Sequence, residues 1–574
     1  MEPILIVHGY SAESALDTPA EVQEIFGSLP DDLVALFREQ QAATGNVPVA
    51  AGSEADAFIV DVNISRYVSL DDGVSLDDIS LAFDRIMNSA AFKPLLTTGF
   101  NAIIHSTGAL VLRNWIRRYS PKPSPCKRII HLAGANLGSG WAHIGETQLA
   151  KWLRYIGQGG QERGLAVLEG LELGSNWAID LHTHFLQAGQ SMLHDYGVME
   201  FSVVGSQPPP AWMIVPFRYG KEDGSDGVVR VSASNLNHNY LRLGPTATSS
   251  PIAWERIDWD EAEKFAQRTV AASTRGDLAD FSEGSAFAGG YYKLIEASFP
   301  DEVPVRDAGS EAVPPEPVRP AVPFAIPYCC AHSTAEMGIV YGTAPHPDVL
   351  ALIRRALTCA FSDYGGQAAA FAAVTAQAYA QAKSRDHVAG MLELFEDVET
   401  GVEKLFGNAK PAVDNYLHSP QAQYDKHAQV VFRVKDQNGK PIKDCSIHFN
   451  SFGGDSAGGG ASPKSLINSL FEDTHLNNAS ANTVTFYLRL EAWNAGAETW
   501  EDRLPAINGV DLEIDSIDPL TDEILFLPLR MRLTADRLAQ FVKPHETTII
   551  DVTLMRLPSK KTFSLYPNPA LPAS

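Results

Sequence analysis

A serine in this chain lies in the setting of a catalytic nucleophile. Ser106 stands in the stretch Ile-His-Ser-Thr-Gly at positions 104–108, between a predicted strand and a predicted amphipathic helix. In the pattern Gly-x-Ser-x-Gly, such a turn strains the serine backbone and exposes the hydroxyl, which can then attack a carbonyl carbon. This chain keeps the second glycine, Gly108, and has Ile104 in place of the first. On these five residues alone, an ordinary strand-to-helix turn fits as well.

A second feature of the same chemistry lies near the N-terminus. The apolar run Ile4–Val7 predicts a short strand that ends in His8 and Gly9. In α/β hydrolases an early loop supplies one backbone N–H to the oxyanion, and the residue after the nucleophile supplies the other. The sequence therefore predicts Tyr10 and Thr107 as the two donors, with Gly9 permitting close approach. A first strand followed by a tight turn is the alternative.

Two aspartates compete for the role of the acid that orients the base. Asp226 follows the apolar run 199–204, which predicts a strand, and Val228 and Val229 come just after it. A carboxylate in this position holds the catalytic histidine and stabilises its imidazolium form. Asp223 stands just before it in a similar Asp-Gly pair. We favour Asp226 because the apolar pair after it would anchor the loop, although both Asp-Gly pairs also fit simple turns.

His332 has the position expected of the general base among the 16 histidines of the chain. It precedes a predicted helix over 347–357, which would be the last helix of the hydrolase domain. The order Ser106, Asp226, His332 is the triad order of α/β hydrolases. His238, which follows Asp226 more closely, is the other candidate. A surface or core histidine is the alternative for either one.

The elements around these residues predict an α/β fold. Near-continuous apolar strands alternate with amphipathic helices over residues 1–135, which is typical of a parallel sheet covered on both faces. We expect strands at 4–7, 57–64, 100–104 and 128–132, and helices at 31–41, 76–90 and 109–119.

Two insertions are expected within the hydrolase domain. The segment 138–195 has a helical pattern, and it is interpreted either as a lid that binds the acyl chain or as a helical excursion packed on the sheet. Its His182 and His184 lack a partner at metal-ligand spacing, so we expect no metal there. The segment 300–327 is rich in proline and predicts an extended loop near the rim of the site.

The C-terminal part of the chain has a different pattern. With the hydrolase domain at 1–365 and a helical bridge at 366–425, residues 426–574 predict an all-β, sandwich-like domain. A strand at 430–434, an Asn-Gly turn and a strand at 445–450 predict a β-hairpin. Further strands are expected at 483–490, 524–529 and 547–554.

Composition argues against several classes of partner. The 574 residues include 45 basic and 69 acidic side chains, a formal net charge of −24. This charge disfavours nucleic acid and electrostatic attraction to anionic lipid, so a peripheral membrane contact would be local and hydrophobic. The five cysteines have no spacing typical of a disulfide framework or a zinc site. The glycine-rich stretch 453–460 lacks the Lys-Ser/Thr ending of a phosphate loop, and no cofactor is predicted.

No targeting segment is predicted. The apolar run at 4–7 is too short for a signal peptide and lacks a basic flank. No apolar stretch approaches the roughly 20 residues of a transmembrane helix. We expect a protein that is made in the cytoplasm and is cytoplasmic or membrane-associated, and signal-less export stays open.

The motifs together resemble the bacterial PlaB-type phospholipases A, within the α/β-hydrolase superfamily of lipases and esterases. Their nucleophile motif has the form x-His-Ser-Thr-Gly, and a β-rich domain follows their hydrolase domain. The resemblance implies Ser106 as nucleophile, Asp226 as acid and His332 as base, although the Asp-to-His interval is longer here. It also implies phospholipase A and lysophospholipase A activity on glycerophospholipids, no metal, and a tendency to form homo-oligomers.

We therefore predict a serine hydrolase that cleaves lipid esters through an acyl-enzyme. Two alternatives stay open: a carboxylesterase for soluble short-chain esters, and a non-catalytic hydrolase fold that binds a partner through the β-rich domain. Faster hydrolysis of long or aggregated acyl chains distinguishes a lipase from an esterase. Covalent labelling of the serine distinguishes an enzyme from a binding protein.

Overall fold

The computed structural model of the chain describes residues 2–9, 27–43, 59–62, 73–140, 165–207, 223–245, 292–306, 318–332, 337, 346–384, 420–452, 470–503, 509–516 and 524–558. The predicted strand at 57–64 and the predicted helical bridge at 366–425 lie partly within these ranges. Tyr10, the glycine-rich stretch 453–460 and the middle of the insertion at 138–195 lie outside them.

A sheet of six parallel strands forms the first part of the fold, in the order β2-β1-β3-β4-β5-β9. The strands are β1 Ile4–Val7, β2 Ile59–Val62, β3 Phe100–His105, β4 Cys126–Leu132, β5 Met199–Val203 and β9 Phe324–Ala325. Successive side chains of β1 enter opposite cores: Leu5 and Val7 pack on one face, Ile4 and Ile6 on the other. Both faces are covered, which explains the near-continuous apolar runs.

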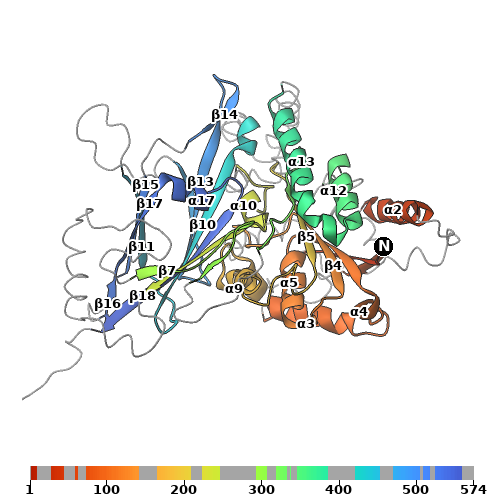
Figure 1. Cartoon of the computed structure of the whole chain (residues 1–574), viewed down its shortest axis with the longest axis horizontal. Coiled ribbons are helices and arrows are strands. Elements are labelled where there is room, and N and C mark those ends of the chain that lie inside the picture. The colour runs from red at the N-terminus through yellow and green to blue at the C-terminus, as the bar shows by residue number, and fades with distance from the viewer. Residues whose placement is uncertain are drawn as a thin grey trace, which may run out of the picture.

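Helices cover both faces of this sheet, as Figure 1 shows. On one face lie α3 Leu76–Met87, α4 Leu95–Thr98, α5 Gly108–Arg118, α8 Leu165–Leu171 and α9 Asn176–His184; on the other lie α2 Leu29–Ala43, α12 Pro347–Thr358 and α13 Gln367–Ala382. Trp115 of α5 is buried in the first core, and Leu352 of α12 is buried in the second. The result is the predicted α/β architecture, an α/β/α sandwich around a parallel sheet.

Two further sheets pack against each other beside the first. A nine-stranded sheet has the order β12-β13-β10-β18-β6-β7-β8, with β14 beside β13 and β16 beside β18, and a three-stranded sheet has the order β11-β15-β17. Their strands are β6 Asn239–Pro245, β7 Tyr292–Ser298, β8 Val305–Arg306, β10 Lys426–Asp436, β11 Cys445–Phe452, β12 Phe471–Leu476, β13 Thr483–Asn494, β14 Thr499–Asp502, β15 Gly509–Ser516, β16 Ile524–Leu527, β17 Leu529–Thr534 and β18 Thr547–Pro558. One apolar core, with Phe432 from the larger sheet and Leu512 from the smaller, joins the two.

The predicted domain boundary does not separate the first sheet from the nine-stranded sheet. Strands β6, β7 and β8 lie within the segment 1–365, which was expected to be hydrolase only, yet they belong to the nine-stranded sheet. β6 pairs in parallel with β18, with Leu241 opposite Ile550. The hydrolase segment and the C-terminal segment therefore share one sheet. Parallel pairing between segments so distant in the chain leaves no local sequence signal, since no short turn connects the strands.

The predicted hairpin at 430–450 is also corrected. Its Asn-Gly turn forms, since Gly439 has φ 77° and the Asp436 N–H donates to the Lys440 carbonyl at 2.8 Å. Beyond it, the pairing is limited to a single bridge between Lys435 and Pro441, where the Ile442 N–H donates to the Val434 carbonyl at 3.2 Å. The next strand, β11, pairs instead with β15 of the small sheet.

The proline-rich segment 300–327 contains strands as well as loop. β8 joins the nine-stranded sheet, and β9 pairs in parallel with the end of β5, where Val203 faces Ala325. An edge position tolerates the neighbouring prolines because only one side of the strand forms a ladder. β9 leads directly to His332 at the carboxyl edge of the first sheet, so the segment positions the predicted base.

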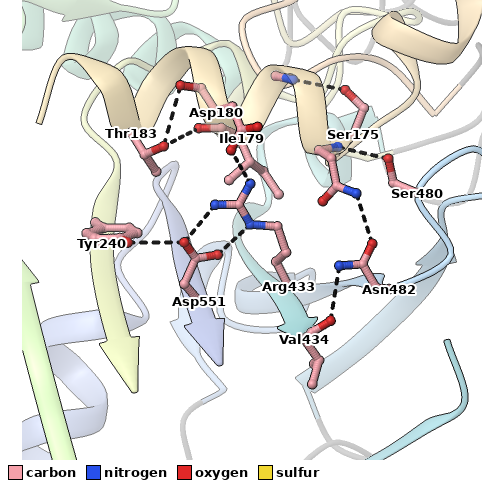
Figure 2. Close-up of polar contacts among 12 residues, drawn as sticks. Ser175, Ile179, Asp180, Thr183, Tyr240, Arg433, Val434, Ser480, Asn482 and Asp551 are labelled. Carbon is pink, nitrogen blue, oxygen red and sulfur yellow. Dashed lines mark hydrogen bonds and ion pairs between the residues drawn. The ribbon is translucent and has the colours of Figure 1, made fainter. Parts of the chain in front are cut away.

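A polar cluster joins the predicted helical insertion to the nine-stranded sheet (Figure 2). Arg433 of β10 makes two hydrogen bonds to the Asp551 carboxylate, at 2.6 and 2.7 Å, and a further ion pair with Asp180 of α9. Tyr240 donates to the same Asp551 at 3.1 Å. The described helices of the insertion therefore pack between α5 and the second sheet, as the helical-excursion interpretation expects. Residues 141–164, where a lid would continue, lie outside the described ranges.

Candidate active site

The turn at 104–108, called here the nucleophile turn, connects β3 to α5. Ser106 has φ 51°, a left-handed conformation that is unfavourable for a residue with a side chain. A backbone hydrogen bond anchors the turn to the sheet: the Ser106 N–H donates to the Leu132 carbonyl of β4 at 3.3 Å. Strain of this kind is typical of functional sites. The local structure is that of a nucleophile elbow.

Two glycines let β1 approach this turn. A Cβ added to Gly9 would lie 2.6 Å from the Cβ of Ser106, and one added to Gly108 would lie 2.8 Å from the Val7 carbonyl oxygen. Real Cβ atoms do not reach such distances, so both positions require glycine. Ile104, which replaces the first glycine of the motif, is fully buried in the apolar core beside α5. Close approach here therefore depends on Gly9 and Gly108 and not on position 104.

The predicted acid lies in the loop 223–231, called here the acid loop. Asp226 is fully buried, and its Oδ1 accepts hydrogen bonds from the N–H groups of Val228 at 3.0 Å and Val229 at 2.7 Å. Gly227 has φ 94°, which lets the chain fold back around the carboxylate. Oδ2 remains directed at a histidine.

The imidazole of His332 lies between Asp226 and Ser106. Its Nδ1 is 2.9 Å from Asp226 Oδ2, and its Nε2 is 3.1 Å from Ser106 Oγ. The His332 N–H also donates to the Asp226 backbone carbonyl at 3.1 Å, so backbone and side chain bind the same residue. These are the contacts of a serine, a base and an acid that orients the base.

A second histidine supports the loop that carries the first. His105, next to Ser106, donates from Nε2 to the His332 carbonyl oxygen at 2.8 Å. Its ring lies 4.8 Å from that of His332 and 5.9 Å from that of His8. Burial, assisted by His332, lowers the pKa of His105 well below its usual value, and burial lowers the pKa of His8 to about 4. Both rings are therefore neutral at physiological pH.

The nine-stranded sheet holds the acid loop from outside. The Tyr487 hydroxyl donates to the Asp223 carbonyl at 2.9 Å, and the Gly224 carbonyl lies 3.2 Å away. Arg489 pairs with the Asp223 carboxylate at 3.1 Å, and the Arg230 guanidinium stacks 4.2 Å above the Tyr487 ring. A Cβ on Gly224 would lie 2.8 Å from the Tyr487 hydroxyl. These contacts pack the acid loop closely against β13.

The structure separates the sequence-predicted site residues into two groups. Ser106, Asp226 and His332 come together, and the Thr107 N–H stands at the start of α5, 3.2 Å from where a Gly9 Cβ would be. The two rivals lie elsewhere: Asp223 faces Arg489 of β13, and His238 lines a separate cavity. The second predicted oxyanion donor, Tyr10, lies outside the described residues.

Sequence reasoning missed two kinds of site residue. His105 lies inside the motif itself, and its position next to the nucleophile was the available signal. Tyr487 and Arg489 had no such signal, since they lie 264 and 266 positions from Asp223, the loop residue that they contact. Within the described ranges, no cluster of three or more histidine, cysteine, aspartate or glutamate side chains could hold a metal ion. No helix of the same ranges is long and apolar enough to cross a membrane.

The parallel sheet, the nucleophile elbow and the carboxyl-edge triad geometry define an α/β-hydrolase fold. Two structures of phospholipase PlaB from Legionella pneumophila, one in complex with thio-NAD, are similar to this chain over 100% of its length and 98% of theirs, with TM-score 0.63 and 19% sequence identity. The propeptide form of the Bacillus licheniformis lipase BlEst2 is similar over 41% of this chain and 44% of that chain, with TM-score 0.26 and 14% identity. No protein-family model and no curated protein sequence match the chain. At this identity, the likeness to PlaB establishes a shared fold along the whole chain.

Proposed function

We propose that this protein is a serine hydrolase that cleaves carboxylic esters of lipids, with phospholipase A and lysophospholipase A activity. One observation carries the proposal: His332 bridges the Ser106 hydroxyl and the buried Asp226 carboxylate at hydrogen-bond distances of 3.1 and 2.9 Å. A surface or core histidine would not need a nucleophile on one ring nitrogen and a carboxylate on the other. The shared fold with PlaB supports the choice of phospholipids among esters.

The geometry suggests the following chemistry. His332 takes the proton of Ser106 as its Oγ attacks the ester carbonyl carbon, and Asp226 stabilises the imidazolium that forms. The Thr107 N–H, at the N-terminus of α5, binds the developing oxyanion, and Tyr10 is proposed as the second donor. The tetrahedral intermediate then collapses, and His332 gives its proton to the leaving alcohol. Water, activated by His332, releases the carboxylic acid from the acyl-enzyme and restores Ser106.

The substrate and its setting are also part of the proposal. A phospholipase must reach lipid in an aggregated state, so we expect peripheral contact with a lipid surface. With a net charge of −24, this contact would depend on apolar side chains more than on attraction to anionic headgroups. We also propose that the protein forms homo-oligomers and is cytoplasmic or membrane-associated.

Ester hydrolysis by the wild type and by Ser106→Ala tests the proposal. A short p-nitrophenyl ester and a long-chain phospholipid serve as parallel substrates, and Ser362→Ala, an exposed serine, is the matched control. We expect Ser106→Ala to lose both activities by about 10⁴-fold or more, since removal of the nucleophile removes the whole triad mechanism. The control should stay near the wild type. Faster turnover of the phospholipid identifies a lipase, whereas turnover of the short ester alone identifies a soluble-substrate esterase. Activity retained in folded Ser106→Ala would rule out the triad.

A further inference from the structure

A small cavity, partly open to solvent, lies beside α5 and takes no part in the proposed reaction. It has a volume of about 60 Å³ and is lined by side chains from α5, α9, β5, three loops and the short helical turn that contains Tyr364. Its charged and imidazole groups are Arg113, His182, Glu200, His238 and Arg319. Such a set is unusual for an interior, because each buried polar group needs a partner to offset its lost hydration.

Several nitrogen atoms of the residues around the cavity have no hydrogen-bond partner among the described residues. His238 is 3% exposed, and within the described chain neither of its ring nitrogens has a partner. The guanidinium of Arg319 donates from Nη2 to the His238 carbonyl at 2.5 Å, but its Nε has no partner among the described residues. Arg113 lies 3.2 Å from Glu200, and its Nε likewise has no partner in the part of the chain that the structure describes. Three residues that line the cavity therefore keep hydrogen-bonding capacity that the described protein groups do not use.

Among the described residues that line the cavity there are two guanidinium groups and one carboxylate. The carboxylate, Glu200, binds Arg113 at 3.2 Å and His131 at 3.1 Å. Burial lowers the pKa of Arg319 to about 10, so the side chain stays charged at neutral pH. The carboxylates that act on Arg319 electrostatically are Glu546 and Asp301, and neither is among the lining residues. Arg319 therefore brings to the cavity a positive charge that Glu200 does not pair.

The histidines do not add charge. Burial lowers the pKa of His238 well below its usual value, and Arg113 and Arg319 lower it further. Burial has the same effect on His182, whose Nε2–H donates to the Asn136 carbonyl at 2.5 Å. A neutral imidazole offers one N–H donor and one acceptor. His238 can therefore donate to an anion beside it, or accept from a protonated oxygen of that anion.

We propose that this cavity binds one small tetrahedral oxyanion, such as inorganic phosphate, between Arg113, Arg319 and His238. Guanidinium groups present forked N–H donors that match oxyanions, and hydrogen bonds to a charged acceptor are the strong ones. The space suits the size of such an ion, since a water molecule needs on the order of 10–15 Å³ of the same kind of volume. We commit to the free ion, since esterification to glycerol replaces one of the oxygens that these donors would bind. The site is independent of the proposed esterase activity.

Equilibrium dialysis of the full chain against radiolabelled inorganic phosphate, in chloride buffer of constant ionic strength, tests this proposal. We expect saturable binding at a single site per chain. Arg319→Gln should weaken binding by about tenfold or more, because it removes a charged donor. Arg242→Gln is the matched control, since Arg242 lies on β6 with 45% of its side chain exposed and faces Glu296. It should bind phosphate like the wild type.

Circular dichroism first checks that Arg319→Gln is folded. If it is not, His238→Leu takes its place, because it removes both ring nitrogens and keeps an apolar side chain. Unsaturable binding, or saturable binding unchanged in a folded cavity variant, would overturn the proposal. Sulfate should compete with phosphate. Glycerol 3-phosphate should compete poorly; equal competition would contradict a free ion as the source and would assign the same oxyanion chemistry to a lipid headgroup.

Discussion

The nucleophile turn and the acid loop are held by different parts of the molecule. Ser106 is positioned by its own sheet: Gly9 and Gly108 bring β1 against the turn, and β4 accepts its backbone N–H. Asp226 lies in a loop that Tyr487 and Arg489 of the nine-stranded sheet hold from the other side. His332 connects the two, with its ring bound at both ends.

This difference indicates what the second sheet contributes. An α/β-hydrolase sheet can build a nucleophile elbow alone, because the elbow depends on local backbone geometry. In this chain the acid is placed by contacts with residues far along the sequence, on a strand of another sheet. The nine-stranded sheet is therefore part of the site's support and not an independent appendage. Substitutions in the nucleophile turn, in the acid loop and in the nine-stranded sheet should therefore have different effects on kcat and on stability.

The largest difference in kcat is expected between Asp226→Asn and Asp223→Asn. The Val228 and Val229 N–H groups would hold the amide oxygen at the position of Oδ1, so the amide NH2 would face His332 Nδ1. The histidine then loses both its acceptor and the negative charge that stabilises its imidazolium form. We expect about 10⁴-fold lower kcat, the scale known for such a change in a serine protease triad. Asp223→Asn removes the charge that pairs with Arg489, away from His332, and should cost less than about tenfold. Steady-state kinetics on a soluble ester measures both, and equal losses would contradict the assignment of Asp226.

Gly9→Ala should damage the nucleophile side selectively. The new Cβ would stand 2.6 Å from Ser106 Cβ, and neither atom belongs to a flexible side-chain end. The turn must shift, and a displacement of this scale at a reacting group lowers kcat by about 10²-fold. Gly365→Ala is the control, since a Cβ there meets nothing within 4 Å. Wild-type kcat in Gly9→Ala would show that close approach of β1 is not required.

Tyr487→Phe should have a smaller effect on kcat, because it removes one hydrogen bond that holds the acid loop. The ring stays stacked on His427 and Arg230, while the bond to the Asp223 carbonyl is lost. We expect stability to fall by about 1–3 kcal/mol and kcat to fall by up to about tenfold with KM unchanged, because the loop loses one restraint. Tyr292→Phe is the control: this buried tyrosine of β7 binds the Leu527 carbonyl and the Met555 N–H, away from the acid loop. It should lose stability but keep kcat. An equal drop in kcat in both variants would remove the special role of Tyr487.

Low pH should destabilise the fold near the nucleophile turn and near the nine-stranded sheet, because it protonates histidines whose rings are neutral in the folded state. Burial lowers the pKa of His8 to about 4 and that of His545, beside the second sheet, to about 3. Each folded-state pKa lies below the unfolded value of 6.5, so the unfolded state binds more protons, and stability is lost as pH falls from 6.5 through the folded pKa. For His8 the loss is about 3 kcal/mol.

Urea unfolding of His8→Asn and His545→Asn at about pH 7 and about pH 4.5 measures this contribution. Each variant should show a smaller drop in unfolding free energy on acidification than the wild type. Asn also suits position 545, where φ is 64°. A drop identical to that of the wild type in both variants would mean that these histidines do not control acid stability.

The nucleophile turn and its flanking elements could be predicted from the sequence because they are formed by residues close together in the chain. The strand, turn and helix at 100–118 follow from apolar periodicity, and the structure has them at Phe100–His105 and Gly108–Arg118. The three triad candidates followed from chain order and loop context. What could not be predicted was long-range pairing: β6 with β18, β11 with β15, and the contact of the acid loop with β13. These depend on side-chain fit between distant segments, and periodicity carries no information about partners.

The proposed hydrolase activity requires Ser106 to be an activated nucleophile, and labelling with a fluorophosphonate probe tests this requirement most directly. Intact-mass and peptide analysis would locate the label after treatment of wild type, Ser106→Ala and Asp226→Asn. The account predicts stoichiometric label on Ser106 in the wild type, none in Ser106→Ala, and slow labelling in Asp226→Asn, where His332 is no longer oriented. An unlabelled wild type, or label that persists in Ser106→Ala, would contradict the account and favour a non-catalytic role for the fold.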